Sequence, residues 1–238
     1  MCQSQKQQHP PGARSRAVWV VVPAFDEQDR LGPTLAALTA HYPHVVVVDD
    51  GSRDGTAQAA QRYPVRLLRH AINCGQGAAL QTGIEYALSR GAEVIVTFDA
   101  DGQHAVDDIA PLVAPVEAGE VQVTLGSRFR GQTVGMPLSR HLVLWLGVWF
   151  TRLCSGLRVS DTHNGLRAFS REAAARLRIT QNRMAHASEI LDQVRRHGLS
   201  YSEVPVTVRY SPATLRRGQT SWSALRIASQ YLLGRLIR

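Results

Sequence analysis

Two carboxylates separated by one residue follow an apolar stretch of the sequence. Asp99 and Asp101 come directly after residues 94–98. Residues i and i+2 of an extended chain point to the same side, so both carboxylates can face one cation. Mg²⁺ and Mn²⁺ bind carboxylate oxygens and commonly keep coordination positions for phosphate oxygens. The spacing therefore predicts a divalent metal site, with a capping turn as the simpler alternative.

A second carboxylate pair, Asp49 and Asp50, follows the apolar residues 45–48. A turn with an Asx-type cap before the next helix explains Ser52 and Asp54, which come after the pair. Such a turn does not explain two adjacent carboxylates at the end of a buried strand, because their repulsion costs stability without compensation. We therefore expect this pair to contact a ligand.

Two common nucleotide-binding motifs do not occur in the sequence. The first apolar stretch ends at Pro23 and continues as A-F-D-E, where a Rossmann dinucleotide site needs G-x-G-x-x-G. No G-x-x-x-x-G-K-[ST] segment is present. NAD-dependent enzymes and P-loop NTPases are therefore disfavoured as function classes.

The charges are divided unevenly along the chain. The 238 residues carry 27 Lys and Arg against 19 Asp and Glu, a formal net charge of +8. Residues 1–120 hold 9 basic and 14 acidic side chains, whereas residues 121–238 hold 18 basic and 5 acidic ones. A basic coat for nucleic acid would not usually leave the first half acidic, so we expect no nucleic-acid partner.

The elements that must position these residues alternate regularly in the first half of the chain. We expect strands at 17–22, 45–48, 65–68, 94–98 and 121–125, and helices at 31–41, 54–62, 76–89 and 107–117. Short apolar strands between amphipathic helices are typical of an α/β fold with a parallel sheet covered on both faces. Ligands of such sheets bind outside the carboxyl ends of the strands, where both carboxylate pairs lie.

The pattern becomes less regular after residue 125. We expect a helix at 138–156, a loop at 160–170, helices at 171–177 and 187–197, a strand at 204–209 and an amphipathic helix at 221–238. The apolar run within the first of these helices is far shorter than the roughly 18–20 residues that span a bilayer. The apolar helix at 138–156 and the amphipathic helix at 221–238 leave the same two alternatives. Each either packs on the protein's own core or lies at a membrane surface or on a membrane partner.

The N-terminal stretch and the cysteines bear on the compartment. Residues 1–16 are polar without an apolar core, so we expect a disordered tail rather than a signal peptide. Cys2, Cys74 and Cys154 are odd in number and far apart. This spacing argues against a disulfide framework or a zinc site and favours a reducing compartment.

Four ordered motifs resemble those of family 2 glycosyltransferases with the GT-A fold. They are VPAFDE at 22–27, VVDDGSRDGT at 47–56, N-x-G-x-G-A-A-L-x-x-G at 73–83 and DADGQH at 99–104. Within the family, the sequence is most similar to the polyprenyl-phosphate sugar synthases, which include the dolichyl-phosphate mannose synthases. The resemblance covers about residues 17–209, and it implies a Rossmann-like, mixed but mostly parallel sheet with helices on both faces.

The resemblance also implies the residues of the site. Contacts to the nucleotide sugar are expected from Pro23, Phe25, Glu27, Asp49, Asp50, Asp99, Ala100, Gln103 and Arg209. Asp99, Asp101 and Gln103 are expected to surround a Mg²⁺ or Mn²⁺ ion and the diphosphate. The expected catalytic group is Asp101, Asp161 and Arg128.

The second half of the chain continues the resemblance, with departures. Residues 161–169 resemble the family segment D-x-x-x-G-[FL]-[RK]-x-F, in which Asp161 either pins the loop or faces the acceptor. The dolichyl-phosphate synthases tend to place a lysine at the phosphates, and here Arg216 or Arg217 would take its place. Transferases with a hydroxyl acceptor often carry an E-D pair as general base. The sequence around Glu189 lacks that pair, which favours a phosphate acceptor.

The resemblance implies an inverting, metal-dependent glycosyltransferase that moves a sugar from a UDP- or GDP-linked donor to a polyprenyl (undecaprenyl) phosphate. It would act in the cytoplasm, as a peripheral protein at the inner face of the cytoplasmic membrane. Residues 17–126 would form the nucleotide and metal half of a domain ending at 215, and 127–215 its acceptor half. Residues 216–238 would form a basic loop and amphipathic helix at the membrane surface or on a small membrane protein.

Two alternatives stay open. One is a family 2 transferase that uses a sugar hydroxyl as acceptor in cell-surface polysaccharide synthesis, with Asp161 or Glu189 as general base. The other is a non-catalytic subunit that binds a nucleotide sugar and recruits a membrane partner.

Overall fold

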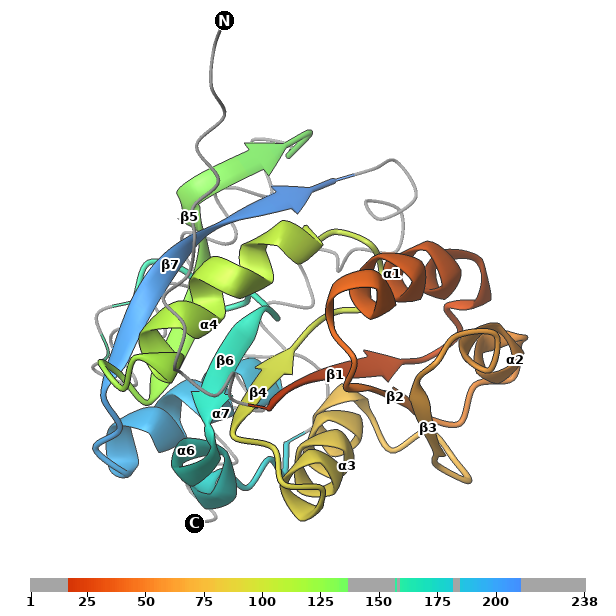
Figure 1. The fold of residues 1–238 in the computed structure, drawn as a ribbon, viewed down its shortest axis with the longest axis horizontal. Coiled ribbons are helices and arrows are strands. Elements are labelled where there is room, and N and C mark those ends of the chain that lie inside the picture. The colour runs from red at the N-terminus through yellow and green to blue at the C-terminus, as the bar shows by residue number, and fades with distance from the viewer. Residues whose placement is uncertain (1–16, 137–156, 158, 182–184, 211–238) are drawn as a thin grey trace, which may run out of the picture.

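The computed structural model describes residues 17–136, 157, 159–181 and 185–210 of the chain. Within them, seven strands form one sheet in the order β3-β2-β1-β4-β6-β5-β7 (Figure 1). The strands are β1 (Val18–Ala24), β2 (Val45–Asp49), β3 (Arg66–Arg69), β4 (Val94–Thr97), β5 (Val123–Val134), β6 (Arg167–Ser170) and β7 (Tyr201–Arg209). The helices are α1 (Gln28–His41), α2 (Thr56–Ala60), α3 (Gln76–Ser89), α4 (Ile109–Glu117), α6 (Arg171–Arg176) and α7 (Ala185–Arg196), with a 3₁₀ turn at Val106–Asp108.

Strand β6 runs against both of its neighbours in the sheet. The strands β3, β2, β1 and β4 pair in parallel, and β5 pairs in parallel with β7. Strand β6 pairs antiparallel with β4 and β5, so that Arg167 lies opposite Thr97 and Leu125. The expected mixed, mostly parallel sheet is confirmed. Because β6 is reversed, the residues that precede it lie at the carboxyl edge of the parallel strands.

Helices cover both faces of the sheet, because alternate strand residues point to opposite sides. Val21 belongs to the apolar cluster formed with α3, α6 and α7. Val20 and Val22 belong to the cluster formed with α1, α2 and α4. Figure 1 shows α1 and α4 on one side of the sheet and α3 and α6 on the other. Strand β2, covered on both faces, is buried along its whole length, which explains its unbroken run of valines.

Helix α3 packs closely on β1 at Gly83, where any side chain would overlap the strand. At Gly83, an added Cβ would lie 2.3 Å from Cγ1 of Val21 and 3.2 Å from Cγ2 of Val48. The helix spans the residues that the sequence predicted, Gln76–Ser89. Its close approach to β1 and β2 brings its first turn to the edge where those strands end.

Several boundaries differ from the expected ones. Strand β5 continues to Val134 and β7 begins at Tyr201, because the two strands pair with each other on both sides of a β-bulge. Helix α2 is shorter than the expected 54–62. The expected loop at 160–170 is wrong at its end, where β6 begins at Arg167. The segment R-A-F-S has no apolar run, yet all four residues are buried, since the Arg167 guanidinium donates to backbone carbonyls.

Three expected segments lie outside the described residues: the tail 1–16, the helix 138–156 and the terminal helix 221–238. Arg216 and Arg217 lie outside them as well. Among the helices that are described, none combines the length and the apolar character needed to cross a bilayer.

We predict that Gly83→Ala destabilises the fold. Alanine gains about 1 kcal/mol of helix propensity over glycine. Its Cβ would overlap Cγ1 of buried Val21, and such overpacking costs about 1–3 kcal/mol. With a contact as short as 2.3 Å the clash outweighs the gain, so urea unfolding should show a lower midpoint. Glu85→Ala, on the exposed side of the same helix, is the control and should change stability by less than about 0.5 kcal/mol. A stabilised Gly83→Ala protein would contradict the close approach.

Candidate active site

A cleft with a volume of about 510 Å³ lies at the carboxyl edge of the sheet. Its walls come from the residues that follow β1, β2 and β4, from the first turn of α3, and from Arg128 of β5. The loop that precedes β6 and the first turn of α7 complete it. The cleft therefore lies where α/β sheets bind their ligands, and the reversed strand adds a loop that this rule does not predict.

Most of the residues expected in the site line this cleft. They are Pro23, Phe25, Glu27, Asp50, Asp99, Ala100, Asp101, Gln103 and Arg128. Phe25 is 43% exposed, unlike the buried aromatic residues of the core, and so offers an apolar face to a planar ring. Asp49, Asp161 and Arg209 do not line the cleft.

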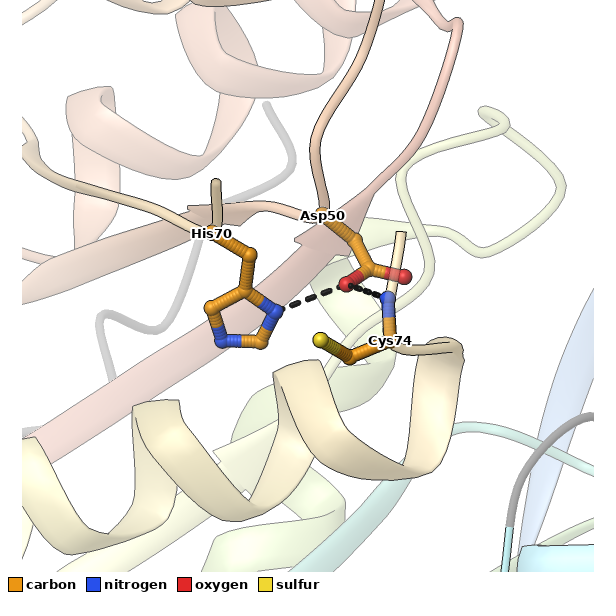
Figure 2. A group of neighbouring side chains, drawn as sticks. All are labelled: Asp50, His70 and Cys74. Atoms are coloured by element: carbon orange, nitrogen blue, oxygen red, sulfur yellow. Dashed lines mark hydrogen bonds and ion pairs between the residues drawn. The ribbon is translucent and has the colours of Figure 1, made fainter. Parts of the chain in front are cut away.

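The carboxylate of Asp50 is held at the wall of the cleft by three donors. Its Oδ1 accepts from Nδ1 of His70 at 2.7 Å and from the backbone N–H of Cys74 at 2.9 Å. Its Oδ2 accepts from the N–H of Gly75 at 2.6 Å. Figure 2 shows the dashed lines from His70 and from the backbone nitrogen of Cys74 meeting at one carboxylate oxygen of Asp50. Nε2 of His70 lies 3.0 Å from Oγ1 of Thr82, which fixes the imidazole in turn.

The same three residues are a candidate metal group. A carboxylate oxygen of Asp50, a ring nitrogen of His70 and the sulfur of Cys74 lie within 4.8 Å of one another. The hydrogen bonds above already use both ring nitrogens and both carboxylate oxygens. We therefore assign the group to orienting Asp50 rather than to binding a metal.

Asp49 has partners of its own, and its position corrects the expected role. The side chain is fully buried. Its Oδ2 accepts from Nε of Arg69 at 2.9 Å, and its Oδ1 accepts from the N–H of Ser52 at 3.0 Å. Our premise that the repulsion between Asp49 and Asp50 is uncompensated is wrong, since β3 supplies Arg69 to one carboxylate and leads into His70 for the other. Asp49 thus stabilises the turn after β2 instead of facing the cleft.

Asp99 lies at the centre of the cleft wall, with its side chain 28% exposed. Its Oδ1 accepts from Nε2 of Gln76 at 3.1 Å, and its Oδ2 lies 3.1 Å from Nε2 of His104. Burial acts to raise the pKa of Asp99, but the hydrogen bond from His104 and the charge of Arg167 lower the pKa below the ordinary value. Asp99 is therefore ionised at neutral pH.

Asp101 stands beside Asp99 in a different state. Its Oδ1 accepts from the backbone N–H of Gln103 at 3.0 Å. Burial, and then the negative charge of Asp99, raise the pKa of Asp101 above its ordinary value. Two partly buried carboxylates that repel each other are stabilised by a shared cation. This donor set of oxygens, with the amide of Gln103 also in the cleft, fits Mg²⁺ or Mn²⁺.

Arg128 adds a positive charge to the lining of the cleft. It is only 7% exposed, and its Nε donates to Oδ2 of Asp161 at 2.6 Å, while one terminal nitrogen donates to the hydroxyl of Tyr210 at 2.6 Å. Burial acts to lower the pKa of Arg128, but the charge of Asp161 raises it above the ordinary value. Asp161 also accepts from the N–H of His163. These contacts support the structural alternative for Asp161, which holds Arg128 and does not face the cleft.

Two further basic side chains of the cleft follow Asp161 in the chain. Arg167 donates to the backbone carbonyls of Asn164 and Thr162, and burial lowers its pKa to about 10, so that it keeps its charge at neutral pH. Burial also lowers the pKa of His163, to about 4. His163 is therefore a neutral imidazole at neutral pH.

Glu189, the other candidate base, is used within the protein. Its carboxylate accepts from the N–H and the hydroxyl of Thr180 and from the N–H of Gln181. It is 2% exposed and does not line the cleft, whereas His186, one turn earlier in α7, does. This placement weakens the case for Glu189 as a general base.

Arg209 ends β7 with an exposed side chain outside the cleft lining. Its backbone N–H donates to the carbonyl of Gln103 at 2.9 Å, and the adjacent Val208 bridges to His104. Strand β7 thus anchors the segment that carries Asp101 and Gln103.

Sequence reasoning left nine polar cleft residues unassigned. They are Arg30, Asn73, Gln76, Thr97, His104, His163, Asn164, Arg167 and His186. Asn73, Gln76 and His104 belong to the motifs at 73–83 and 99–104, and this membership could have identified them as site residues. The last four precede or begin a strand or a helix. In the sequence we looked for polar residues that follow apolar strands, so these four were not singled out.

We predict that Gly165→Ala disables the site while leaving the protein folded. An added Cβ would lie 2.1 Å from Oδ2 of Asp99, and the backbone cannot yield freely because Oγ1 of Thr97 donates to the Gly165 carbonyl. Asp99 must therefore move, and Mn²⁺ titration should show at least about tenfold weaker binding. Gly32→Ala, whose Cβ meets the Tyr63 hydroxyl at 3.3 Å, is the matched control. Unchanged metal binding in the Gly165 variant would exclude Asp99 as a ligand.

The sequence matches a known family over most of its described residues. The family model described as Glycosyl transferase family 2 matches residues 19–178, which is more than half of the chain. This match spans all the motifs that contribute carboxylates to the cleft, as well as the loop before β6.

Curated relatives extend the match towards the C-terminus. The chain is 31% identical over 241 residues to the UDP-N-acetylglucosamine–dolichyl-phosphate N-acetylglucosaminyltransferase of Methanococcus voltae, covering 92% of this chain and 96% of the relative. It is 30% identical to the polyprenol monophosphomannose synthase of Mycolicibacterium smegmatis, covering 79% of this chain and 76% of the relative.

A solved structure shares the fold. Glucosyl-3-phosphoglycerate synthase from Mycobacterium tuberculosis, crystallised with Mn²⁺, UDP and glucosyl-3-phosphoglycerate, superimposes with a TM-score of 0.70 over 94% of this chain and 84% of that chain, at 21% identity. The expected GT-A fold is confirmed by this likeness and by the strand order. With the family model and the curated relatives in agreement, the chain belongs to glycosyl transferase family 2 and is a glycosyltransferase.

Proposed function

We propose that this glycosyltransferase moves a sugar from a nucleotide diphosphate sugar to a polyprenyl phosphate, with inversion and with a divalent cation at Asp99 and Asp101. The observation that carries the proposal is the composition of this cleft, in which these two carboxylates and the buried cation Arg128 share the lining. A diphosphate with its metal and a second phosphate group are the ligands that this combination suits.

The order of the strands suggests how the donor lies. Asp50 follows β2, Phe25 follows β1, Asp99 follows β4, and Gly165 precedes β6, in the order of the sheet. Neighbouring strands are about 4.8 Å apart, so the distance from β2 to β6 is roughly 14 Å. An extended nucleotide sugar fits this span, with its base between Asp50 and Phe25 and its diphosphate at Asp99.

The cation would be held by Asp99 and Asp101, with Gln103 beside them. When bound, it would offset the negative charge that develops on the departing nucleoside diphosphate. The Mn²⁺ and UDP crystallised with the fold relative support a divalent ion with a uridine nucleotide as the first choice to test. The guanine alternative stays in the test, because the second curated relative is a mannose synthase.

The acceptor is inferred from the missing general base as well as from the relatives' names. Both carboxylates considered as bases, Asp161 and Glu189, are engaged in buried hydrogen bonds and do not line the cleft. A phosphate acceptor needs no base, because its oxygen is already ionised at neutral pH. Relatives named for dolichyl phosphate and polyprenol monophosphate point to the same acceptor class.

The reaction is a single displacement. An oxygen of the acceptor phosphate attacks the anomeric carbon from the face opposite the diphosphate. The new C–O bond forms as the bond to the diphosphate breaks, and the electron pair leaves with the diphosphate. Arg128, fixed by Asp161 and Tyr210, would hold the acceptor phosphate in line. The anomeric configuration is inverted.

The proposed place of action is the inner face of the cytoplasmic membrane, where undecaprenyl phosphate would present its head group. Residues 216–238 would meet the membrane surface or a small membrane protein through the basic loop and the amphipathic helix, and no nucleic acid is involved. Arg216 or Arg217 would add a cation at the phosphates. A sugar-hydroxyl acceptor and a non-catalytic nucleotide-sugar-binding subunit are the two alternatives that the experiments must separate.

The decisive experiment measures label transferred to lipid. Purified protein with Mn²⁺ is incubated with labelled UDP-GlcNAc, UDP-glucose or GDP-mannose and a short-chain polyprenyl phosphate. We expect label in the organic phase with at least one donor, and none with the matching polyprenol, which lacks the phosphate nucleophile. Label on a sugar hydroxyl alone would favour the other transferase, and donor binding without any transfer would favour the non-catalytic subunit.

We predict that Asp101→Asn lowers kcat by about 10²-fold or more, because the leaving diphosphate loses its charge compensation. The change keeps the size of the side chain, so circular dichroism and the unfolding midpoint should stay close to those of the wild type. Asp29→Asn, at an exposed position of α1, is the matched control and should retain full activity. Metal-dependent turnover at the wild-type rate in the Asp101 variant would exclude it from the metal site.

A further inference from the structure

Asn164 carries a side-chain amide whose orientation is fixed by its own turn. It lies in the loop that precedes the reversed strand β6, lines the cleft and is 2% exposed. Its Oδ1 accepts from the backbone N–H of Leu166 at 2.9 Å, an Asx-type contact two residues on. Because the oxygen is committed to this bond, the amide nitrogen Nδ2 must point the other way.

Nδ2 of Asn164 is a buried donor that has no hydrogen-bond partner among the residues that the structure describes. Buried polar groups of folded proteins are nearly always hydrogen-bonded, and a buried donor without an acceptor destabilises the fold. The neighbouring polar groups have partners within the protein: Arg167 donates to three backbone carbonyls, and Thr97 donates to the carbonyl of Gly165. An unmet donor in a cleft wall indicates an acceptor that a ligand brings.

The position of Asn164 along the cleft indicates which part of a ligand it meets. The adjacent Gly165 packs against Asp99, since a Cβ there would lie 2.1 Å from the carboxylate. Strand β6 is the neighbour of β4 on the side away from β1 and β2. Asn164 therefore lies beyond Asp99 as seen from Asp50. A donor with its base at Asp50 and its diphosphate at Asp99 brings its sugar to this loop.

The chemistry of the group agrees with that position. Arg128 and Arg167 are charged and suit phosphate oxygens, whereas an amide N–H is a neutral donor that suits a hydroxyl. A buried site built to hydrogen-bond a hydroxyl discriminates strongly against sugars that lack it, because the site is then left with an unpaired group. We propose that Nδ2 of Asn164 donates to a hydroxyl of the transferred sugar and helps to determine which donor is accepted. The inference rests on the proposed function for the direction in which the donor lies.

Two variants separate ligand binding from the local turn. Asn164→Asp keeps an oxygen that can accept from the N–H of Leu166, removes the donor and adds a negative charge, so its affinity for the nucleoside diphosphate is read beside that of the neutral Asn164→Ala. Asn164→Ala removes the donor and the turn together. Dissociation constants are measured in Mn²⁺ for UDP-GlcNAc, UDP-glucose and GDP-mannose, and for UDP and GDP without a sugar.

We expect both variants to bind the preferred nucleotide sugar about tenfold more weakly, the effect of one lost hydrogen bond, and to bind the corresponding nucleoside diphosphate as the wild type does. Normal binding by Asn164→Asp would overturn the inference in favour of the turn. Equal losses for the nucleotide sugar and the nucleoside diphosphate would overturn it in favour of a diphosphate contact. Unchanged donor binding with a raised KM for polyprenyl phosphate would overturn it in favour of the acceptor.

The readout is independent of the acceptor, so this inference and the proposed function can fail separately. A wild-type protein that binds a nucleotide sugar but does not label polyprenyl phosphate would refute the proposed acceptor and leave the dissociation constants to decide the role of Asn164. A wild-type protein that binds none of the three nucleotide sugars would overturn both.

Discussion

The reversed direction of β6 determines how the cleft is built. Parallel strands deliver the residues that follow them to the carboxyl edge, and β1, β2 and β4 do so with Phe25, Asp50 and Asp99. An antiparallel strand between β4 and β5 delivers the residues that precede it to the same edge. The loop that ends at β6 therefore lies beside Asp99 at van der Waals distance, and only a glycine at position 165 leaves room for the carboxylate. The reversed strand thus adds the loop before β6 to an edge of the sheet that otherwise carries mainly acidic residues.

Buried charges are stabilised in this cleft by partners that leave one functional face open. Removing one member of a buried ion pair typically costs several kcal/mol, so such pairs hold their geometry firmly. Asp161 accepts from Nε of Arg128 and the Tyr210 hydroxyl accepts from one of its terminal nitrogens, so that the guanidinium is fixed where it lines the cleft. Asp50 is held by His70 and two backbone N–H groups. Asp99 and Asp101 differ, because burial and then the charge of Asp99 raise the pKa of Asp101, and a cation at the proposed metal site would relieve this repulsion. The protein thus fixes Asp50 and Arg128 with its own groups, whereas the proposed cation would bind at the two carboxylates that repel each other.

The sequence was most informative where one element determines the outcome. The bounds of α3 are predictable because its apolar period and its glycines are local, and for the same reason the D-x-D spacing predicts that Asp99 and Asp101 lie together, as they do in the cleft lining. The role of Asp49 was not predictable, because its compensation comes from Arg69, which the parallel register of β2 and β3 brings opposite it. Strand β6 was missed because its first residue is an arginine, which is buried because carbonyls of its own loop and of Ala187 in α7 accept its hydrogen bonds. Partners of this kind depend on strand order and direction, which apolar periodicity does not encode.

The uneven charge along the chain acquires a spatial meaning in the folded protein. The acidic first half contributes Asp50, Asp99 and Asp101 to the cleft, and the basic second half contributes Arg128 and Arg167. A nucleotide diphosphate sugar is anionic along most of its length and neutral at its sugar, so it needs a cation at the acidic wall and neutral donors beyond it. An incoming phosphate needs fixed positive charge that the metal does not already use. In the proposed binding mode, Asp99 and Asp101 would hold the cation at the diphosphate, and Arg128 would remain for the incoming phosphate. Because β6 is reversed, the loop that precedes it lies at the same edge of the sheet as the carboxylates of the first half. Residues of the basic second half therefore line the same cleft as the acidic residues of the first half.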